Sequence, residues 1–203
     1  MTTSIISSEF SNSKIVCSKE GVVLLRETDD SNSYRILFNA HNPNFPIHSI
    51  VGLKLYTLLY ELNRDIIHAF KVVNETETTI ETVTLFKPFG KDFGISPKAM
   101  HTVSTMHHES DACTFNSVDV QLDNANNEIN HIPKKYERIH STHSKLIVYF
   151  LSPNDLQFNF TFELSDDSND EELSRCPIYM ENSVALMIKK MFCRLKGFTE
   201  RMA

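Results

Sequence analysis

The sequence predicts an α+β fold, with a mostly antiparallel sheet and two helices packed on it. Two kinds of periodicity indicate this class. Short runs rich in β-branched and aliphatic residues alternate with turn-forming residues, as strands do, and apolar residues recur at helical spacing near residues 49–63 and 179–198. With 203 residues, of which 41% are hydrophobic, the chain can build one sizeable core. We therefore expect a flexible N-terminus over residues 1–12 and a single domain over residues 13–203.

Three strands are predicted at the start of this domain. Residues 13–18, 21–27 and 33–40 are rich in valine, isoleucine and leucine, and polar residues that favour turns separate them. This spacing predicts an antiparallel meander.

A central helix is predicted over residues 49–63. Two prolines interrupt the extended pattern just before it, and Ser49 is a suitable N-cap. The apolar residues that follow fall on one helical face: Val51, Leu55, Leu58, Leu59, Leu62 and Ile66. The chain should then return as strands over residues 66–73 and 78–86.

The middle of the chain carries weaker signals. Ser96 and Pro97 could cap a short helix over residues 96–106, and a strand is expected over residues 112–122. Residues 123–143 are rich in asparagine and lack any period, so we expect an irregular loop there.

A β-hairpin is the clearest local unit of the second half. Residues 145–152 and 156–164 are joined by a Pro-Asn-Asp turn. In the second strand, apolar residues take every second position and therefore point to one face: Leu156, Phe158, Phe160, Phe162 and Leu164. An acidic, solvated loop is expected over residues 165–174.

The composition argues against several classes of protein. The five glycines form no phosphate-binding motif, so we expect no nucleotide cofactor. Four cysteines without a C-x-x-C pair argue against both a zinc ribbon and a disulfide-rich scaffold. No signal sequence or membrane-spanning apolar run is recognisable, so we expect an intracellular protein. No catalytic motif stands out, and we expect no enzymatic activity.

Nine histidines raise the question of a metal site. The candidate ligands fall in two regions: His101, His107, His108 and Cys113 in one, and the H-x-x-H pair of His140 and His143 in the other. The spacing permits ligation, but no carboxylate and histidine motif such as H-E-x-x-H occurs. We interpret these residues as solvent-exposed loop histidines and predict no metal.

Two of these histidines support a catalytic alternative. Residues 108–110 (His-Glu-Ser) and 140–142 (His-Ser-Thr) are H-x-[ST] elements, and in that feature they resemble the two-histidine phosphoesterases. The resemblance implies a histidine acid and a histidine base acting on a phosphodiester. In that family each motif ends an apolar strand, whereas both elements lie in polar segments here, so this reading is the lesser alternative.

A basic segment offers a possible nucleic-acid contact. Lys134, Lys135 and Arg138 surround Tyr136, so cations for phosphates lie beside a ring that can stack on a base. A solvated basic loop is the other interpretation. The formal net charge of -6 favours it, because an acidic protein attracts nucleic acid weakly. We expect any nucleic-acid contact to be weak or indirect.

The last helix, predicted over residues 179–198, is apolar on more than one side. One continuous stripe should face the core: Met180, Val184, Met187, Ile188, Met191, Leu195 and Phe198. Further apolar and basic residues widen this stripe or lie opposite it: Leu186, Lys189, Lys190, Phe192, Cys193 and Lys196. Such a helix is either sandwiched within its own domain or shared with a partner. Because a terminal helix is shared more easily, we predict that the second set binds a protein partner.

The terminal segment CPIYMENSVALMIKKMFCRLKGF, a proline-led helix after a strand and a turn, resembles the end of the transducer domain of topoisomerase VI B subunits. The earlier order of three strands, a helix and a returning strand is also similar. The resemblance implies a coupling subunit that docks a DNA-cleaving partner, and, through reduced meiotic relatives, a nuclear role in DNA recombination. The family's ATPase motif D-x-G-x-G is absent, so no ATP hydrolysis is implied. A self-assembling viral or other structural protein is the alternative.

Overall fold

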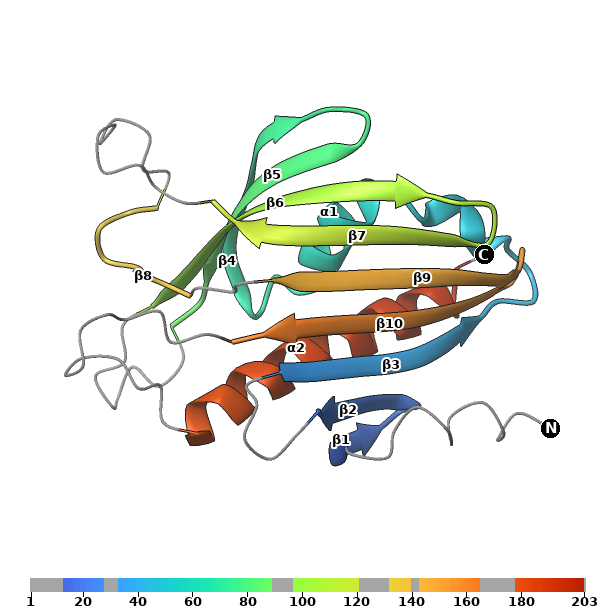
Figure 1. Ribbon diagram of the computed structural model, residues 1–203, viewed down its shortest axis with the longest axis horizontal. Helices are drawn as coiled ribbons and strands as arrows, with labels where there is room; N and C mark the ends of the chain where they lie inside the picture. The colour runs from blue at the N-terminus through green and yellow to red at the C-terminus, as the bar shows by residue number, and fades with distance from the viewer. Residues whose placement is uncertain are drawn as a thin grey trace.

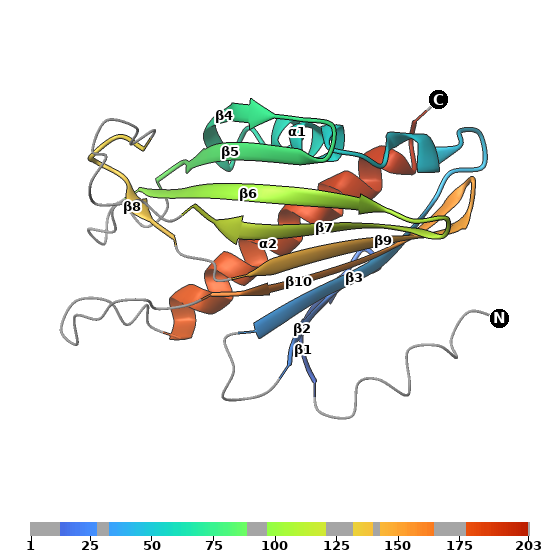
Figure 2. The same ribbon diagram turned by 45° about the horizontal axis from the view of Figure 1, so that its top comes forward.

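The computed structural model describes residues 13–27, 33–88, 97–120, 132–139, 143–164 and 178–202. They form one curved sheet with two α-helices on its concave side (Figure 1, Figure 2). The strand order is β1-β2-β3-β10-β9-β7-β6-β5-β4, and a short strand, β8, pairs with β6 off this path. The α+β class predicted from the sequence is confirmed.

The meander predicted at the start is present. β1 (Lys14–Lys19), β2 (Val22–Arg26) and β3 (Ser33–His41) are successive antiparallel neighbours. A two-residue turn joins β1 to β2. Its residues Glu20 and Gly21 have positive φ, 56° and 73°, which suits the right-handed twist of the two strands.

The central helix is shorter than predicted. A 3-10 turn, η1 (Ile47–Ile50), comes first, and α1 (Lys54–Glu61) follows. The proposed N-cap at Ser49 is wrong, because its hydroxyl donates to the carbonyl of Pro46 at 2.9 Å and the helix begins only after Leu53. A short connecting segment therefore separates η1 from α1.

Four strands follow as an antiparallel series: β4 (Ile67–Glu75), β5 (Thr79–Phe86), β6 (Lys98–His108) and β7 (Ala112–Asp119). The helix predicted over residues 96–106 is therefore wrong. Most of that stretch is strand, and β6 is held by β5 on one side and by β7 on the other. Pairing with two neighbouring strands outweighs a weak capping signal.

The predicted hairpin is present at the centre of the sheet. β9 (Ser144–Ser152) pairs with β10 (Asp155–Glu163), and β10 pairs in turn with β3. The region predicted to be an irregular loop contains β8 (Glu137–Arg138), which runs parallel to β6. The predicted N-terminus, most of the loop at residues 123–143 and the acidic loop at residues 165–174 lie outside the described residues.

The last helix, α2 (Ile178–Thr199), packs one broad side against the rest of the domain. It crosses the concave face of the sheet and packs on β2, β3 and α1 (Figure 2). The ring of Phe192 lies 6.0 Å from that of Phe38 and 4.9 Å from that of Phe160. The buried residues of the helix cover one broad side of it: Val184, Ala185, Lys189, Met191, Phe192, Leu195 and Thr199. The broad apolar surface of this helix is therefore used inside the domain.

Asn42 fixes the C-terminal end of α2 to the loop after β3. Its side-chain amide donates to the carbonyls of Thr199 and Met202, both at 2.8 Å. Its side-chain oxygen accepts from the backbone N–H groups of Asn44 and Phe45. Asn42 is 1% exposed, so these bonds are made away from water.

A second anchor joins α2 to the turn after α1. Arg194 makes a bidentate ion pair with Asp65 and donates to the side-chain oxygen of Asn63 at 3.1 Å. The ammonium of Lys190 lies 3.6 Å from the carboxylate of Asp65. Hydrogen bonding to Arg194 holds the pKa of Asp65 well below its usual value.

Candidate ligand-binding cavity

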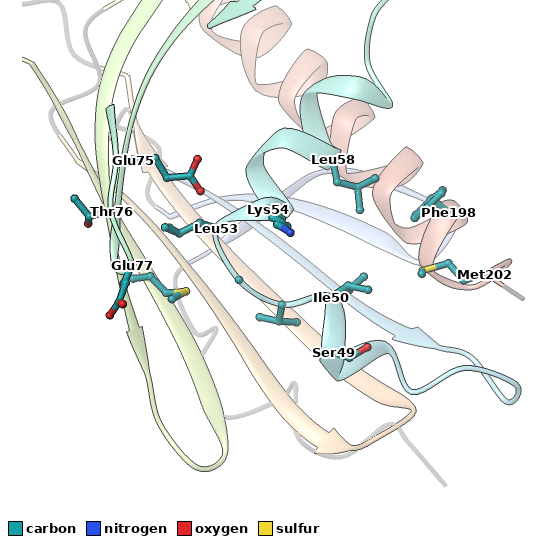
Figure 3. Close-up of a pocket in the computed structure, with 13 residues that line it drawn as sticks. Ser49, Ile50, Leu53, Lys54, Leu58, Glu75, Thr76, Glu77, Phe198 and Met202 are labelled. Atoms are coloured by element: carbon teal, nitrogen blue, oxygen red, sulfur yellow. The ribbon is translucent and has the colours of Figure 1, made fainter. Parts of the chain in front are cut away.

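A cavity of about 610 Å³ lies between α1, the β4–β5 turn and the C-terminal end of α2 (Figure 3). Its lining comes from separate parts of the chain: residues 49–54, Leu58 of α1, residues 75–77, Met106 of β6, Phe198 of α2 and Met202. Figure 3 shows the β4–β5 turn on one side, Phe198 and Met202 on the other, and Leu53 and Leu58 between them.

The cavity has an apolar wall and a charged rim. Leu53 is buried, and Leu58 and Met106 are half-buried, whereas Lys54 and Glu75 are exposed. Pockets for small molecules are lined mainly by apolar side chains with a few polar groups. The cavity therefore suits a guest that is largely apolar.

The inner face of the sheet near this wall carries hydroxyl groups. The strand register places Ile80, Ser104 and Ser117 side by side across β5, β6 and β7, and Thr82 beside Thr102. Thr82, Ser104 and Ser117 are buried. In β3 and β10, where α2 packs, the inner positions hold large apolar side chains. The concave face is thus apolar under α2 and rich in small hydroxyl side chains on β5 to β7.

Tyr56 of α1 reaches these hydroxyl groups. Its hydroxyl oxygen lies 3.0 Å from that of Ser117, which lies 2.7 Å from that of Ser104. Its ring packs edge-on against Phe115, with ring centroids 5.5 Å apart. Burial raises the pKa of Tyr56, and hydrogen bonding to the two serines opposes that rise. The phenol is therefore neutral at physiological pH.

Tyr60 lies one turn further along α1. Its ring stacks on Phe70 with centroids 3.9 Å apart. Burial raises the pKa of Tyr60 to about 12, although a hydrogen bond to Thr84 acts in the opposite direction. Nearby on the sheet, the hydroxyl oxygens of Thr82 and Thr102 lie 3.2 Å apart. The inner face thus holds a second group of neutral hydroxyls.

No motif in the sequence marks Tyr56, Ser104 or Ser117 as residues of a site. Tyr56 lies in the predicted helix but outside its apolar stripe, and Ser104 lies in the stretch interpreted as a helix. The one available signal was the alternation of Thr102, Ser104 and Met106, which has the period of a strand. That signal places the side chains on one face but cannot say what covers the face.

Among the described residues, the histidines singled out from the sequence form no metal site. His101 is buried in β6, contrary to the expectation of an exposed loop residue, and its Nε2 lies 2.8 Å from the carboxylate of Glu81. The exposed histidines among the candidates are His107, His108 and His143, and His140 lies outside the described residues. Within the described ranges, no group of three or more metal-binding side chains is placed to hold an ion.

A second hollow of about 610 Å³ lies near the β6–β7 and β9–β10 turns. It is lined in part by His48, His108 and Glu109, and the ring of His108 lies 5.5 Å from that of Phe150. His108 belongs to the first element of the phosphoesterase alternative. The second element, residues 140–142, lies outside the described residues, so the structure gives no geometry for that reaction.

The basic segment is only partly exposed. Lys134 and Lys135 are exposed, but Tyr136 is buried at 9% exposure, and Arg138 donates to the carbonyl of Val120. A buried ring cannot stack on a base, so the aromatic part of the predicted nucleic-acid contact is wrong. Contact between the two lysines and phosphate groups stays a prediction.

The residues predicted to bind a protein partner take different places on α2. Leu186, which is 42% exposed, and Lys190 are on the surface. Phe192 and Lys189 are buried, at 3% and 4% exposure, because the sheet encloses that side of the helix. Two of the residues are half-buried, namely Cys193 and Lys196. The prediction is therefore wrong for Phe192 and Lys189, which an outside partner cannot reach.

Two broader expectations concern cysteines and membranes. Cys17, Cys113 and Cys193 are free thiols, and Cys176 lies outside the described residues. In the part of the chain that the structure describes, no helix has the length and apolar character needed to cross a lipid bilayer.

Comparison with known proteins shows the fold. No protein-family profile and no curated protein sequence matches the chain. The human StarD13 (DLC2) lipid transfer and protein localization domain matches with a TM-score of 0.67 and 12% identity, over 95% of this chain and 91% of that one. Human StAR-related lipid transfer protein 5 matches with a TM-score of 0.65 and 14% identity, over 94% and 87% of the two chains. A STAR-related lipid transfer protein fragment from Xanthomonas axonopodis matches with a TM-score of 0.64 and 13% identity, over 93% of this chain and 98% of that one. The chain therefore has the fold of StAR-related lipid transfer domains.

This likeness corrects the resemblance drawn from the terminal segment. The fold differs from that of a topoisomerase VI B transducer domain, so the interpretation as a coupling subunit in meiotic DNA recombination is wrong. The prediction that the last helix docks a protein partner is also wrong. A strand, a turn and a proline-led helix form a short pattern that unrelated folds share, and such a pattern cannot identify a fold on its own.

Proposed function

We propose that this protein binds an apolar small molecule, such as a lipid, in the cavity between α1, the β4–β5 turn and α2, and that it does so without catalysing a reaction. One observation carries the proposal: an apolar cavity of about 610 Å³ lies beside the concave face of a sheet that has the fold of StAR-related lipid transfer domains. The solved structures compared above are named for lipid transfer.

The size and lining of the cavity support this function. Pockets for small molecules usually have a volume of about 300–1,000 Å³. Transfer of each methylene group from water to an apolar site is favourable by about 0.8 kcal/mol. An alkyl chain or a fused ring system therefore gains affinity by leaving water for a wall that includes Leu53, Leu58 and Met106.

The segment between η1 and α1 is a suitable entrance. It borders the cavity, and a side chain added at Gly52 would meet no atom within 4 Å. We place the path of the ligand there, between Val51 and Leu53 on one side and the β4–β5 turn on the other.

A pair of tryptophan variants tests the proposal. The probe is 1,6-diphenylhexatriene, a hydrocarbon that fluoresces in apolar surroundings, titrated into the delipidated full chain. Leu58→Trp places an indole in the cavity, and the matched control Leu151→Trp places one on the surface, where Leu151 is 59% exposed. The wild type and the control should bind the probe, and Leu58→Trp should lose most of the binding.

Two further measurements complete this test. Circular dichroism must show that Leu58→Trp stays folded, and mass spectrometry of lipid incubated with the protein should recover that lipid chemically unchanged. Absence of probe binding by the wild type, or equal binding by Leu58→Trp, contradicts the binding function. A chemically altered lipid contradicts the non-catalytic part.

A further inference from the structure

We infer that the rim of the cavity selects amphiphiles with a single positive charge, such as long-chain amines, and that Glu75 and Glu77, which line the cavity, hold the ammonium group. The inference rests on the proposed function, because it names the class of ligand that the cavity takes. It predicts that a protonated long-chain amine binds in preference to a carboxylate of the same chain length.

The charged residues that line the cavity are unequal in sign. They supply two carboxylates, from Glu75 and Glu77, and one ammonium group, from Lys54, so the rim carries a formal net charge of -1. All three side chains are exposed, and among the described residues none of them makes an ion pair or a side-chain hydrogen bond. A ligand at the rim can therefore approach these charges directly.

The strand register turns Glu75 toward the cavity. Glu75 is paired with Ile80 across β4 and β5, and Ile80 is paired with Ser104 across β5 and β6. Directly paired residues lie on the same face of a sheet. Met106, two residues after Ser104 on that face, lines the cavity. Figure 3 accordingly shows the carboxylate of Glu75 on the side of the turn that faces α1.

Hydrogen bonds fix the turn that carries the two glutamates. The hydroxyl oxygen of Thr76 accepts from the backbone N–H groups of Thr79 at 3.0 Å and of Thr78 at 3.3 Å. The backbone N–H of Thr76 donates to the carbonyl of Thr79 at 2.9 Å. Because Thr76 lies between Glu75 and Glu77, the turn holds the backbone of both glutamates in place. Only their side chains then lose conformational freedom when a ligand binds.

The position of these charges suits the head of an amphiphile. The cavity wall is apolar where Leu53, Leu58 and Phe198 line it, whereas the glutamates are exposed at the rim. An alkyl chain in the cavity would leave its charged end at the rim, where water still solvates that end and the cost of desolvation is small. There the two carboxylates attract an ammonium group, whereas a carboxylate would be attracted by Lys54 alone and repelled by both glutamates.

Displacement of 1,6-diphenylhexatriene from the delipidated full chain tests this inference. The competitors are hexadecylamine and hexadecanoate at neutral pH, which share the chain length and carry opposite charges. The test variants are the double variant Glu75→Gln with Glu77→Gln, and the single variant Lys54→Gln. The matched control for the double variant is Asp111→Asn with Glu163→Gln, because it changes the net charge of the protein equally at exposed residues outside the cavity lining.

In dilute buffer the wild type should bind hexadecylamine more tightly than hexadecanoate by about fivefold or more, since one exposed ion pair changes an affinity by up to about fivefold. The glutamate double variant should lose this preference, Lys54→Gln should increase it, and the matched control should keep it. In about 1 M salt the preference of the wild type should shrink, because the Debye length there is about 3 Å. Affinity for the uncharged probe should be the same in every variant, which also shows that each one is folded.

The outcomes separate this inference from the proposed function. If the probe binds but the wild type does not prefer hexadecylamine, or if the glutamate double variant keeps that preference, the role of the rim is wrong and the binding of apolar molecules stands. A preference that the matched control also loses would come from the net charge of the protein, which contradicts the inference as well. If the wild type binds neither the probe nor either competitor, the proposed function fails, and this inference fails with it.

Discussion

At the scale of single residues, Phe192 is a large side chain that α2 buries in the core. Its ring lies between those of Phe38 and Phe160 and is 3% exposed. Removal of a buried phenylalanine side chain loses the burial of its apolar surface and leaves a cavity that neighbouring side chains fill only in part. The residue is therefore a sensitive test of the packing described above.

Phe192→Ala should lower the free energy of unfolding by about 3–5 kcal/mol, the usual cost of emptying such a site. Urea unfolding followed by circular dichroism measures the change. Leu186→Ala is the control on the same helix, because Leu186 is 42% exposed, and its effect should stay within about 0.5 kcal/mol. Equal effects of the two substitutions would contradict the placement of the helix.

The contribution of the ion pair between Asp65 and Arg194 to stability should depend on pH. Hydrogen bonding to Arg194 holds the folded-state pKa of Asp65 below its value in the unfolded chain. The ion pair therefore stabilises the fold fully above the unfolded-state pKa of about 3.9, and this stabilisation is lost as the pH falls toward the folded-state value.

Asp65→Asn should lower the free energy of unfolding at pH 7 by at most about 1 kcal/mol, because the pair is largely solvent-exposed. The difference between variant and wild type should become smaller at pH 3. Urea unfolding at the two pH values measures it. The control is Glu61→Gln at the exposed end of α1. A difference that grows in acid would show that the ion pair does not form.

At the scale of elements, α2 is held at its C-terminal end by one asparagine side chain. Helices leave their last carbonyls without partners inside the helix, and Asn42 satisfies the carbonyl of Thr199 from outside. The same side chain accepts bonds from the loop that follows β3. Because the cavity is lined in part by Phe198 and Met202, this anchor also sets the position of one cavity wall.

Asn42→Ala should lower the free energy of unfolding by about 1–3 kcal/mol, because it leaves buried backbone groups without partners. Amide hydrogen exchange should show the loss of protection concentrated in the last turn of α2. Asn44→Ala provides the matched control, since Asn44 is exposed and contributes only its backbone N–H group. Unchanged exchange at Thr199 in Asn42→Ala would rule out the anchor.

At the scale of the whole molecule, α2 covers part of the concave face of the sheet. It buries Val184, Ala185, Met191 and Leu195 together with Phe192. Without the helix, the apolar inner positions of β3 and β10 would face water. The hydrophobic gain from burying them would no longer offset the conformational entropy lost on folding.

A chain that ends at residue 177 should therefore not fold. Its circular dichroism spectrum should lack the native strand signal, and its thermal scan should show no cooperative transition. The full chain should unfold cooperatively under the same conditions. A truncated chain with an intact sheet would mean that α2 is an appendage and does not form a wall of the cavity.

Much of the fold could be predicted from local pattern. Two sequence signals are strong because each follows a single period: the alternation in residues 156–164 and the apolar spacing in the last helix. The helix predicted over residues 96–106 was wrong, because a Ser-Pro pair is only a weak helix signal and the stretch forms β6 between two neighbouring strands. Tyr136 and His101 were expected at the surface, and the packing of distant segments buried them instead.

The sequence by itself determined the α+β class, the meander, the hairpin and the two helices, because short-range periodicity and turn residues specify these features. Only the tertiary structure decided which side of α2 is buried, and that Tyr56 meets Ser104 and Ser117. The physical reason is that sequence patterns are local, whereas tertiary contacts join segments that are far apart in the chain. A period along the chain shows which side of an element is apolar, but the partner of that side comes from segments far away. The cavity therefore forms only when those segments meet.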